Sequence, residues 1–444
     1  MCNGTIMDKL ISFSIPLMLS GILQLMFNAV DIVVVGRFSG SQALAAVGST
    51  TALINVFTNL FIGISLGANV LAARYYATGK TKEMSETVHT AIALALVSGV
   101  AMAVIGVVFA RGALEIMGTP DDVIAKSTLY MRIYFCGMPF FMMYNYGAAI
   151  LRAVGDTKRP LIFLIVSGVI NAVLNLFLVI GFHLDVAGVG IATVISQLVS
   201  CILVLRCLHH TESSYQLHLA KLRIRSVYLK QIFEVGVPAG IQSTVINISN
   251  AMLQSSVNSF GSIAMAGYTA ANNIFGFLYV TVNAVTQACM SFTSQNYGVG
   301  KWKRMDRVLI DCLILSFVAM MILGNSAYFF GPKLLTIYTS NSKVIQCGME
   351  ILLYTTVTYF LCGFMDLFPG ALRGMGRSGV PMILSIIGTV GTRIVWIFWI
   401  FPNHRSLDIL FISYPASWII TIVLQVICYY FVRKQLYAKM RAEA

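Results

Sequence analysis

The chain has 444 residues, of which 58% are hydrophobic and only 11% are charged, and its mean hydropathy is +0.82. In soluble domains roughly a quarter of the residues are charged. This composition therefore excludes an ordinary soluble protein and predicts one that lies in the lipid bilayer. The formal net charge of +13 comes from basic residues spread along the chain, not from one patch interleaved with aromatic residues. We therefore expect no nucleic-acid partner.

Apolar stretches of about 20 residues or more, long enough to cross a bilayer, recur along the chain. In the first half they lie near 10–37, 44–73, 87–110, 127–151, 160–181 and 187–208. In the second half they lie near 230–259, 264–296, 307–330, 348–372, 380–401 and 407–432. We predict an all-α membrane protein with twelve transmembrane helices.

The two halves are related by an internal repeat. Residues 151–160 read Leu-Arg-Ala-Val-Gly-Asp-Thr-Lys-Arg-Pro, and residues 372–381 read Leu-Arg-Gly-Met-Gly-Arg-Ser-Gly-Val-Pro. Pro16 recurs in the same phase as Pro238. Long repeats in a very apolar chain are typical of secondary transporters, in which two similar bundles move against each other.

Six spans return the chain to the side where it began, so the two halves are predicted to be parallel repeats. We place a first six-helix lobe at 1–208, a polar cytoplasmic linker at 209–229 and a second six-helix lobe with a short cytoplasmic tail at 230–444.

Basic residues fix the expected orientation, because cytoplasmic segments carry an excess of Lys and Arg. Arg132 and Arg393 fall within spans, and most of the remaining Lys and Arg residues lie in segments on the side of the N-terminus. The opposite side has only Arg37, Arg111, Lys126, Lys333, Lys343 and Arg405. We expect a multi-pass protein of the plasma membrane with both termini in the cytoplasm.

Several classes of site are not indicated. The chain has no phosphate-binding Gly-x-x-x-x-Gly-Lys-Ser/Thr motif, so transport is not powered by an ATPase on this chain. Its nine cysteines form no Cys-x-x-Cys, and its six histidines have no ligand spacing, so we expect no metal and no cofactor. No second catalytic group is visible near Asp31 or Asp366, and we expect no enzyme activity.

The most informative residues are polar ones inside apolar spans. Asp31 is the sole acidic residue of the first span, where an ionisable group is costly without partners or water. By helical rise, Asp31, Asn175 and Thr193 each lie about 9 Å from the outer end of their spans. Asn171 is one turn deeper on the same helix face as Asn175.

These four residues would form an oxygen-rich cluster that holds Na⁺, or that holds Asp31 ready to bind a proton. For Asn171, Asn175 and Thr193, hydrogen-bonded contact between helices is the alternative. A buried carboxylate contributes little to such contacts unless a cation pairs with it. For Asp31 we therefore favour a functional role over a structural one.

Asp366 is a second acid within a span, and its counterpart in the first half is Asn145. We assign both to a candidate substrate cleft, where a role for Asp366 with a substrate cation or a proton stands beside a structural one. Arg393 lies about 10 Å higher by residue count, a long reach even for an arginine.

The chain resembles the multidrug and toxic compound extrusion (MATE) family of cation-coupled antiporters over all twelve spans. The resemblance rests on the paired Leu-Arg-x-x-Gly motifs before Pro160 and Pro381 and on Pro16, which Asp31 follows fifteen residues later. It rests also on Asn171-x-x-x-Asn175 followed by Ala192-Thr193.

The resemblance implies a V-shaped pair of six-helix lobes. It implies export of amphipathic cationic drugs or metabolites by alternating access, driven by inward Na⁺ or H⁺ flow. We expect a monomer whose partners are organic cations and the bilayer. The resemblance also carries cation or proton binding onto Asp31, Asn171, Asn175 and Thr193, and a helix bend onto Pro16.

Two departures from the family pattern stand out. The position of Asn175 is often Asp in this branch, so a two-acid proton relay is excluded here. The repeat counterpart of Asp31 is Leu253, which makes a complete cation site in the second lobe unexpected.

The alternative is a lipid-linked oligosaccharide flippase of the same superfamily. We would expect several Arg or Lys residues in its cleft to hold pyrophosphate.

Overall fold

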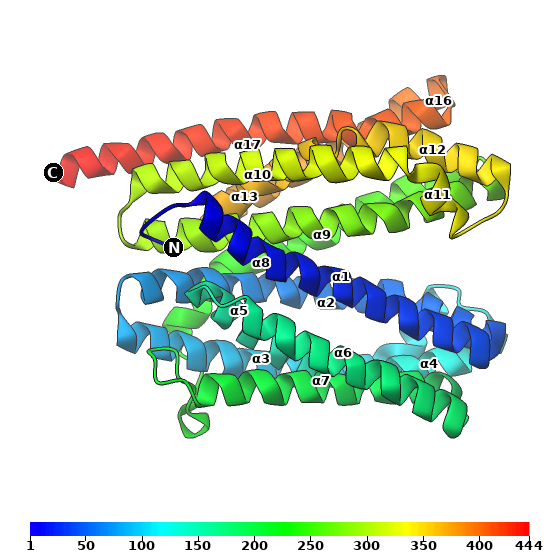
Figure 1. The fold of residues 1–444 in the computed structure, drawn as a ribbon, viewed down its shortest axis with the longest axis horizontal. Helices are drawn as coiled ribbons and strands as arrows, with labels where there is room; N and C mark the ends of the chain where they lie inside the picture. Colours follow the sequence, from blue (N-terminus) through cyan, green and yellow to red (C-terminus); the bar gives the residue numbers. More distant parts are fainter. Residues whose placement is uncertain (444) are drawn as a thin grey trace. The chain divides into compact units, whose positions relative to one another are not determined.

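The computed structural model describes residues 1–443, apart from the side chains of Ser41, Ala52 and residues 439–443. All regular secondary structure of the described residues is helical (Figure 1). The chain forms two compact units. We call Leu19–Gly240 the N-terminal unit, and Met1–Met18 together with residues from 241 onward the C-terminal unit.

The N-terminal unit begins within the first helix and ends within α8. Its elements are the last part of α1 (Met7–Phe38), α2 (Gly40–Ala77), α3 (Thr81–Ile116), α4 (Asp121–Cys136), α5 (Met138–Val154), α6 (Lys158–Leu176), the π-helix η1 (Phe177–Gly181), α7 (Asp185–His209), the 3-10 helix η2 (Leu219–Lys221) and the first part of α8 (Ser226–Asn258).

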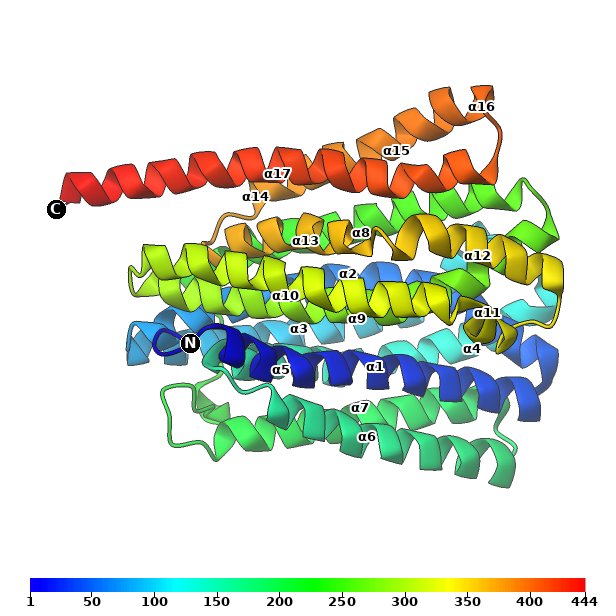
Figure 2. The same cartoon turned by 45° about the horizontal axis from the view of Figure 1, so that its top comes forward.

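The C-terminal unit contains the first part of α1, the last part of α8 and the remaining helices. They are α9 (Ser262–Gly298), α10 (Trp302–Phe329), α11 (Gly331–Thr336), α12 (Ser342–Thr356), α13 (Tyr359–Gly374), α14 (Gly379–Ser385), the π-helix η3 (Ile386–Gly391), α15 (Thr392–Val395), the π-helix η4 (Trp396–Ile400), α16 (Phe401–Asn403) and α17 (Leu407–Glu443). The run from α14 to α15 lies beside α17 (Figure 2).

Each predicted span coincides with one helix or with consecutive helices, which confirms an all-α, multi-pass membrane protein. Among the described residues, nine helices are long and apolar enough to cross a membrane. A tenth span is obtained if α12 and α13, bent by 45° at their junction, are taken together. The predicted span at 127–151 is divided at Gly137 into α4 and α5, and the one at 230–259 is the more polar α8.

The compact units differ from the halves 1–208 and 230–444 expected from the repeat, because the first part of α8 packs with the N-terminal unit. Glycines spaced four residues apart allow this packing. A Cβ atom on Gly63 or Gly67 of α2 would collide with the backbone of α8, and one on Gly236 or Gly240 would collide with the backbone of α2. Small residues at this spacing let transmembrane helices approach closely.

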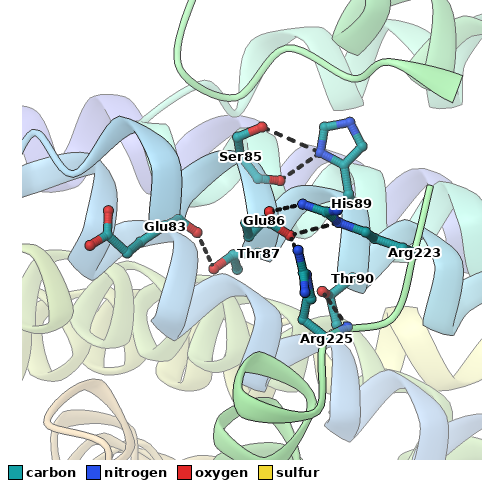
Figure 3. A network of polar contacts seen from close by, with 8 residues as sticks. All are labelled: Glu83, Ser85, Glu86, Thr87, His89, Thr90, Arg223 and Arg225. Atoms are coloured by element: carbon teal, nitrogen blue, oxygen red, sulfur yellow. Dashed lines mark hydrogen bonds and ion pairs between the residues drawn. The ribbon is translucent and has the colours of Figure 1, made fainter. Parts of the chain in front are cut away.

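The linker between the two repeats is fastened to the first turns of α3 (Figure 3). The Glu86 carboxylate pairs with the guanidinium groups of Arg223 and Arg225, the latter with an N···O distance of 3.3 Å. The amide of His218 donates to Nε2 of His89 at 3.1 Å, and the amide of Arg225 donates to the Thr90 hydroxyl at 3.3 Å. The linker is therefore an ordered part of the N-terminal unit.

Candidate cation-binding site

Three helices of the N-terminal unit bring the four predicted polar residues together. Asp31 lies on α1, Asn171 and Asn175 lie on α6, and Thr193 lies on α7. The two asparagines are four residues apart, so their side chains stack on one face of α6. Depth along each span was therefore sufficient to predict which residues meet.

The cluster is a chain of hydrogen bonds that ends at the Asp31 carboxylate. The Thr193 hydroxyl donates to the carbonyl oxygen of Val189 at 2.9 Å and accepts from Nδ2 of Asn171 at 3.5 Å. Nδ2 of Asn175 donates to Oδ1 of Asn171 at 3.2 Å and also to Oδ1 of Asp31. One donor, Nδ2 of Asn175, thus points toward the carboxylate, and the remaining hydrogen bonds run away from it through Asn171 and Thr193 to the backbone of α7.

Within the described structure, the charge of Asp31 has no fixed counter-ion. Among the residues that the structure describes, Asp31 forms no ion pair. Arg132, the basic residue nearest in predicted depth, is exposed and donates to the carbonyl oxygen of Val107 at 3.1 Å. Asn175 is fully buried, and within the described part of the chain its Oδ1 has no hydrogen-bond partner. An unpaired carboxylate beside an unpaired amide oxygen is suited to a proton or a small cation.

Two tyrosines near this cluster were not predicted. The hydroxyl groups of Tyr130 and Tyr134 on α4 lie within electrostatic range of the Asp31 carboxylate. Tyr130 and Tyr134 are four residues apart, so their side chains are expected on one face of the helix. They lie near the predicted outer end of their span. Aromatic residues are common in a chain this apolar, so that spacing did not single them out.

The helix that carries the asparagines has an irregular end. The π-helix η1 (Phe177–Gly181) begins two residues after Asn175. Single-turn π-helices are rare and are frequently found at functional sites. The irregular turn therefore marks the same end of α6 as the polar cluster.

Pro16 lies on the same helix as Asp31, fifteen residues earlier, and α1 continues through it as one helix. Proline has no amide hydrogen, so the helical hydrogen bond at this position is missing. Pro16 belongs to the C-terminal unit and Asp31 to the N-terminal unit. The bend expected at Pro16 stays a prediction.

The two residues assigned to a substrate cleft have different surroundings. Asn145 of α5 donates to the carbonyl oxygen of Phe141 at 2.8 Å, one turn earlier in the same helix. Asp366 of α13 is half-buried in the C-terminal unit, where it hydrogen-bonds with Tyr279 and lies near Arg373. Arg373, not Arg393, is therefore the basic residue that acts on Asp366.

A centre for a transition metal such as zinc would need a different set of ligands. Within the described residues, no group of three or more His, Cys, Asp or Glu side chains is placed to hold a metal ion. The Asp31 cluster offers one carboxylate, two amides and one hydroxyl, which are hard oxygen ligands for a proton or Na⁺.

A family model described as MatE matches residues 16–177 and again residues 238–399, which are the two repeats. The chain belongs to the MATE family. The resemblance drawn from the paired motifs is thereby confirmed, and with it the classification of the chain as a multi-pass membrane transporter without enzyme activity.

Among curated relatives of this MATE protein is the "Probable multidrug resistance protein YoeA" of Bacillus subtilis (strain 168). It is 29% identical over 432 residues, which cover 95% of this chain and 93% of the relative. "Multidrug export protein MepA" of Staphylococcus aureus (strain NCTC 8325 / PS 47) is 22% identical, with coverage of 87% and 85%. The "FAD transporter" of Shewanella oneidensis is 22% identical, with coverage of 85% and 84%.

Solved MATE structures share the fold over the whole chain. "Crystal structure of MATE in the bent conformation" matches with a TM-score of 0.88 at 20% identity, covering 99% of this chain and 97% of the other. "Outward-facing conformation of a multidrug resistance MATE family transporter of the MOP superfamily" matches with a TM-score of 0.89 at 20% identity and the same coverage. The relatives named for multidrug export do not favour the flippase alternative.

Proposed function

We propose that this MATE transporter is a cation-coupled antiporter that exports amphipathic, cationic drugs or metabolites in exchange for Na⁺ or H⁺. The single observation that carries the proposal is the Asp31 carboxylate, which lies inside a membrane span without an ion pair among the described residues. A charge in that position is costly, so an exchangeable cation or proton is the expected partner.

Coupling follows from electrostatics in a medium of low dielectric constant. The ion or proton binds at Asp31, Asn171, Asn175 and Thr193 from the outside and changes the bend near Pro16. Binding of a cationic substrate then weakens, because two positive charges repel strongly where water is scarce. The transporter then changes from a state open to the outside to a state open to the cytoplasm, where the ion is released. This cycle is alternating access.

The proposed setting is the plasma membrane, with both termini in the cytoplasm and the protein acting as a monomer. The distribution of Lys and Arg residues supports this orientation, since the segments on the N-terminal side carry most of them. In this orientation the linker and its contact with Glu86 face the cytoplasm.

The substrate class is proposed from the chemistry of the chain and from its relatives. YoeA and MepA are named for multidrug resistance and export, which supports small organic molecules as substrates. We propose that Asp366, with Asn145 as its repeat counterpart, contributes to recognition of the positive charge. The relative named as an FAD transporter shows that other substrate chemistry has to be included in the test.

Purified protein in liposomes tests the proposal. We expect efflux of a cationic dye from the liposomes against its gradient when an inward gradient of Na⁺ or of protons is imposed across the membrane. This holds for molecules whose cytoplasmic side faces the lumen. Transport that proceeds equally without either gradient would contradict ion coupling. Transport of FAD but not of the dye would contradict the proposed substrate class.

A further inference from the structure

Arg393 is a buried arginine that the proposed transport mechanism does not use. It lies on α15 in the C-terminal unit, and only 3% of its surface is exposed. Its Nη1 atom donates to Oδ1 of Asn250 at 2.7 Å and to the Ser249 hydroxyl at 3.4 Å. Its guanidinium carbon lies 4.7 Å from the centre of the Tyr414 ring on α17. The side chain therefore joins α8, α15 and α17.

These neighbours are the groups that bind a cation. An amide oxygen and a hydroxyl oxygen accept hydrogen bonds from the guanidinium, and the face of an aromatic ring attracts positive charge. The Tyr414 hydroxyl in turn exchanges a hydrogen bond of 2.9 Å with the hydroxyl of Tyr268. The surroundings of Arg393 thus resemble a ligand cage built from neutral groups.

Among the described residues, no acid neutralises the charge of Arg393. Over the residues that the structure describes, Arg393 forms no ion pair and its Nε has no hydrogen-bond partner. An unneutralised charge inside a membrane protein is expensive and is typically kept for a function. Simple stabilisation of the fold is a poor explanation, because an apolar side chain would pack there without that cost.

The internal repeat relates Arg393 to the Asp31 cluster. The family model matches residues 16–177 and 238–399, so its two matches are offset by 222 positions at both ends. Pro160 and Pro381 are only 221 positions apart. A π-helix contains one extra residue, and η3 lies between Pro381 and Arg393. After this insertion the counterpart of Arg393 is Asn171.

The other side of the cage has a counterpart as well. At the same offset, Asn250 of α8 corresponds to Asn28 of α1, and both are followed by Ala. Asn28 precedes Asp31 by three residues, close to one helical turn. The C-terminal unit therefore places a fixed guanidinium where the N-terminal unit has the cluster around a carboxylate.

We propose that Arg393 is a built-in cation, whose guanidinium permanently occupies the repeat counterpart of the exchangeable cation site. This inference rests on the proposed function of the Asp31 cluster. Its consequence is an asymmetric transporter: the contact of α8, α15 and α17 keeps its charge throughout the cycle, and ion exchange is confined to the N-terminal unit.

Chemical rescue tests the proposal. Arg393→Ala should lower the melting temperature of the purified protein and abolish dye efflux in liposomes. Millimolar guanidinium should then raise the melting temperature and restore part of the efflux, because a ligand that binds the folded state stabilises it. Arg405→Ala is the control, since it removes an exposed arginine of the same unit. Neither its melting temperature nor its efflux should respond to guanidinium.

The outcomes are separable. If guanidinium restores neither stability nor efflux in Arg393→Ala, or restores stability alone, the proposal is wrong.

If Arg393→Ala does not fold, Arg393→Lys decides, because it keeps the charge and should fold with the ion dependence of the unchanged protein. A lysine variant that also fails to fold, or that alters the ion dependence, would overturn the proposal. If the unchanged protein shows no ion dependence at all, the proposed function fails, while the effect of guanidinium on the melting temperature remains readable.

Discussion

At the scale of single residues, the Asp31 cluster is organised by the directions of its hydrogen bonds. Asn175 donates to both Asp31 and Asn171 and leaves its own buried oxygen without a partner among the described residues. Rotation of the Asn175 amide would turn that oxygen, in place of the Nδ2 donor, toward a cation bound at the Asp31 carboxylate. Asn175 is therefore the residue whose replacement should change ion binding most selectively.

Replacing Asn175 by Asp introduces a second carboxylate beside Asp31. Two neighbouring carboxylates repel each other when both are ionised, so the pair should bind protons or Na⁺ differently from a single acid. We expect Asn175→Asp to transport with an altered dependence on external pH or Na⁺, measured as initial dye efflux in liposomes. An unchanged dependence on both would place Asn175 outside the ion site.

Asp366 should respond differently, because it lies in the C-terminal unit near Arg373 and Tyr279. We expect Asp366→Asn to change which cationic substrates are exported, or how well, while the ion dependence for any remaining substrate is unchanged. Efflux rates for several cationic dyes, each measured over a range of pH and Na⁺, test this. Loss of ion dependence in this variant would move the coupling site to the C-terminal unit.

Much of the site could be predicted at this scale, and the limits have physical reasons. Asp31, Asn171, Asn175 and Thr193 were predicted because polar residues stand out in apolar spans and helical rise fixes their depth. The Arg393 cage could not be predicted in this way, because the repeat counterpart of Asp31 is the apolar residue Leu253. The cage uses neutral ligands, and the π-helix η3 shifts the alignment of the repeats by one residue.

At the scale of elements, the linker is held by apolar packing of Tyr215 and Leu217 in the core of the N-terminal unit and, nearer α8, by ion pairs. Arg223 and Arg225 both reach Glu86 on α3, and the side chains of the two arginines are half exposed. Partly exposed ion pairs contribute little each, so the part of the linker that they hold should open more readily than the helices around it. Its composition predicted a polar connection, but no pattern in the sequence indicated its contact with α3.

Glu86→Gln removes the charge at the centre of these contacts and keeps the shape of the side chain. We expect it to destabilise the closed state of the last part of the linker by about 1 kcal/mol. Amide hydrogen exchange over residues 219–225 should then be roughly fivefold faster. Glu83→Gln is the matched control: it makes the same change one turn earlier, at a residue without an ion pair in the described structure. Equal exchange in both variants would show that the ion pairs do not hold the linker.

At the scale of the whole molecule, repeat and compact unit are different divisions of one chain. Sequence similarity relates 16–177 to 238–399, whereas contacts divide the chain after Met18 and after Gly240. The repeat could be predicted because its motifs are local in sequence. The compact units could not, since they depend on long-range contacts such as that of Gly63 with Gly240. The division into lobes at the linker remains a proposal based on the repeat.

Orientation in the membrane can be tested by labelling single cysteines in a background without the nine native ones. We expect Lys303→Cys and Gly379→Cys to resist impermeant thiol reagents added to intact cells, because both positions belong to the basic, cytoplasmic side. Asn403→Cys should react. The opposite pattern of labelling would reverse the orientation and place both termini outside.

The most direct measurement is dye efflux driven by an imposed Na⁺ or proton gradient, compared between the unchanged protein and Asp31→Asn in liposomes with equal amounts of folded transporter. Asparagine has nearly the shape of aspartate but no charge, so the protein should remain folded while the cation or proton loses its binding group. We predict that Asp31→Asn abolishes gradient-driven efflux. Efflux of Asp31→Asn at the unchanged rate and with the unchanged ion dependence would contradict the account, because coupling would then not pass through Asp31.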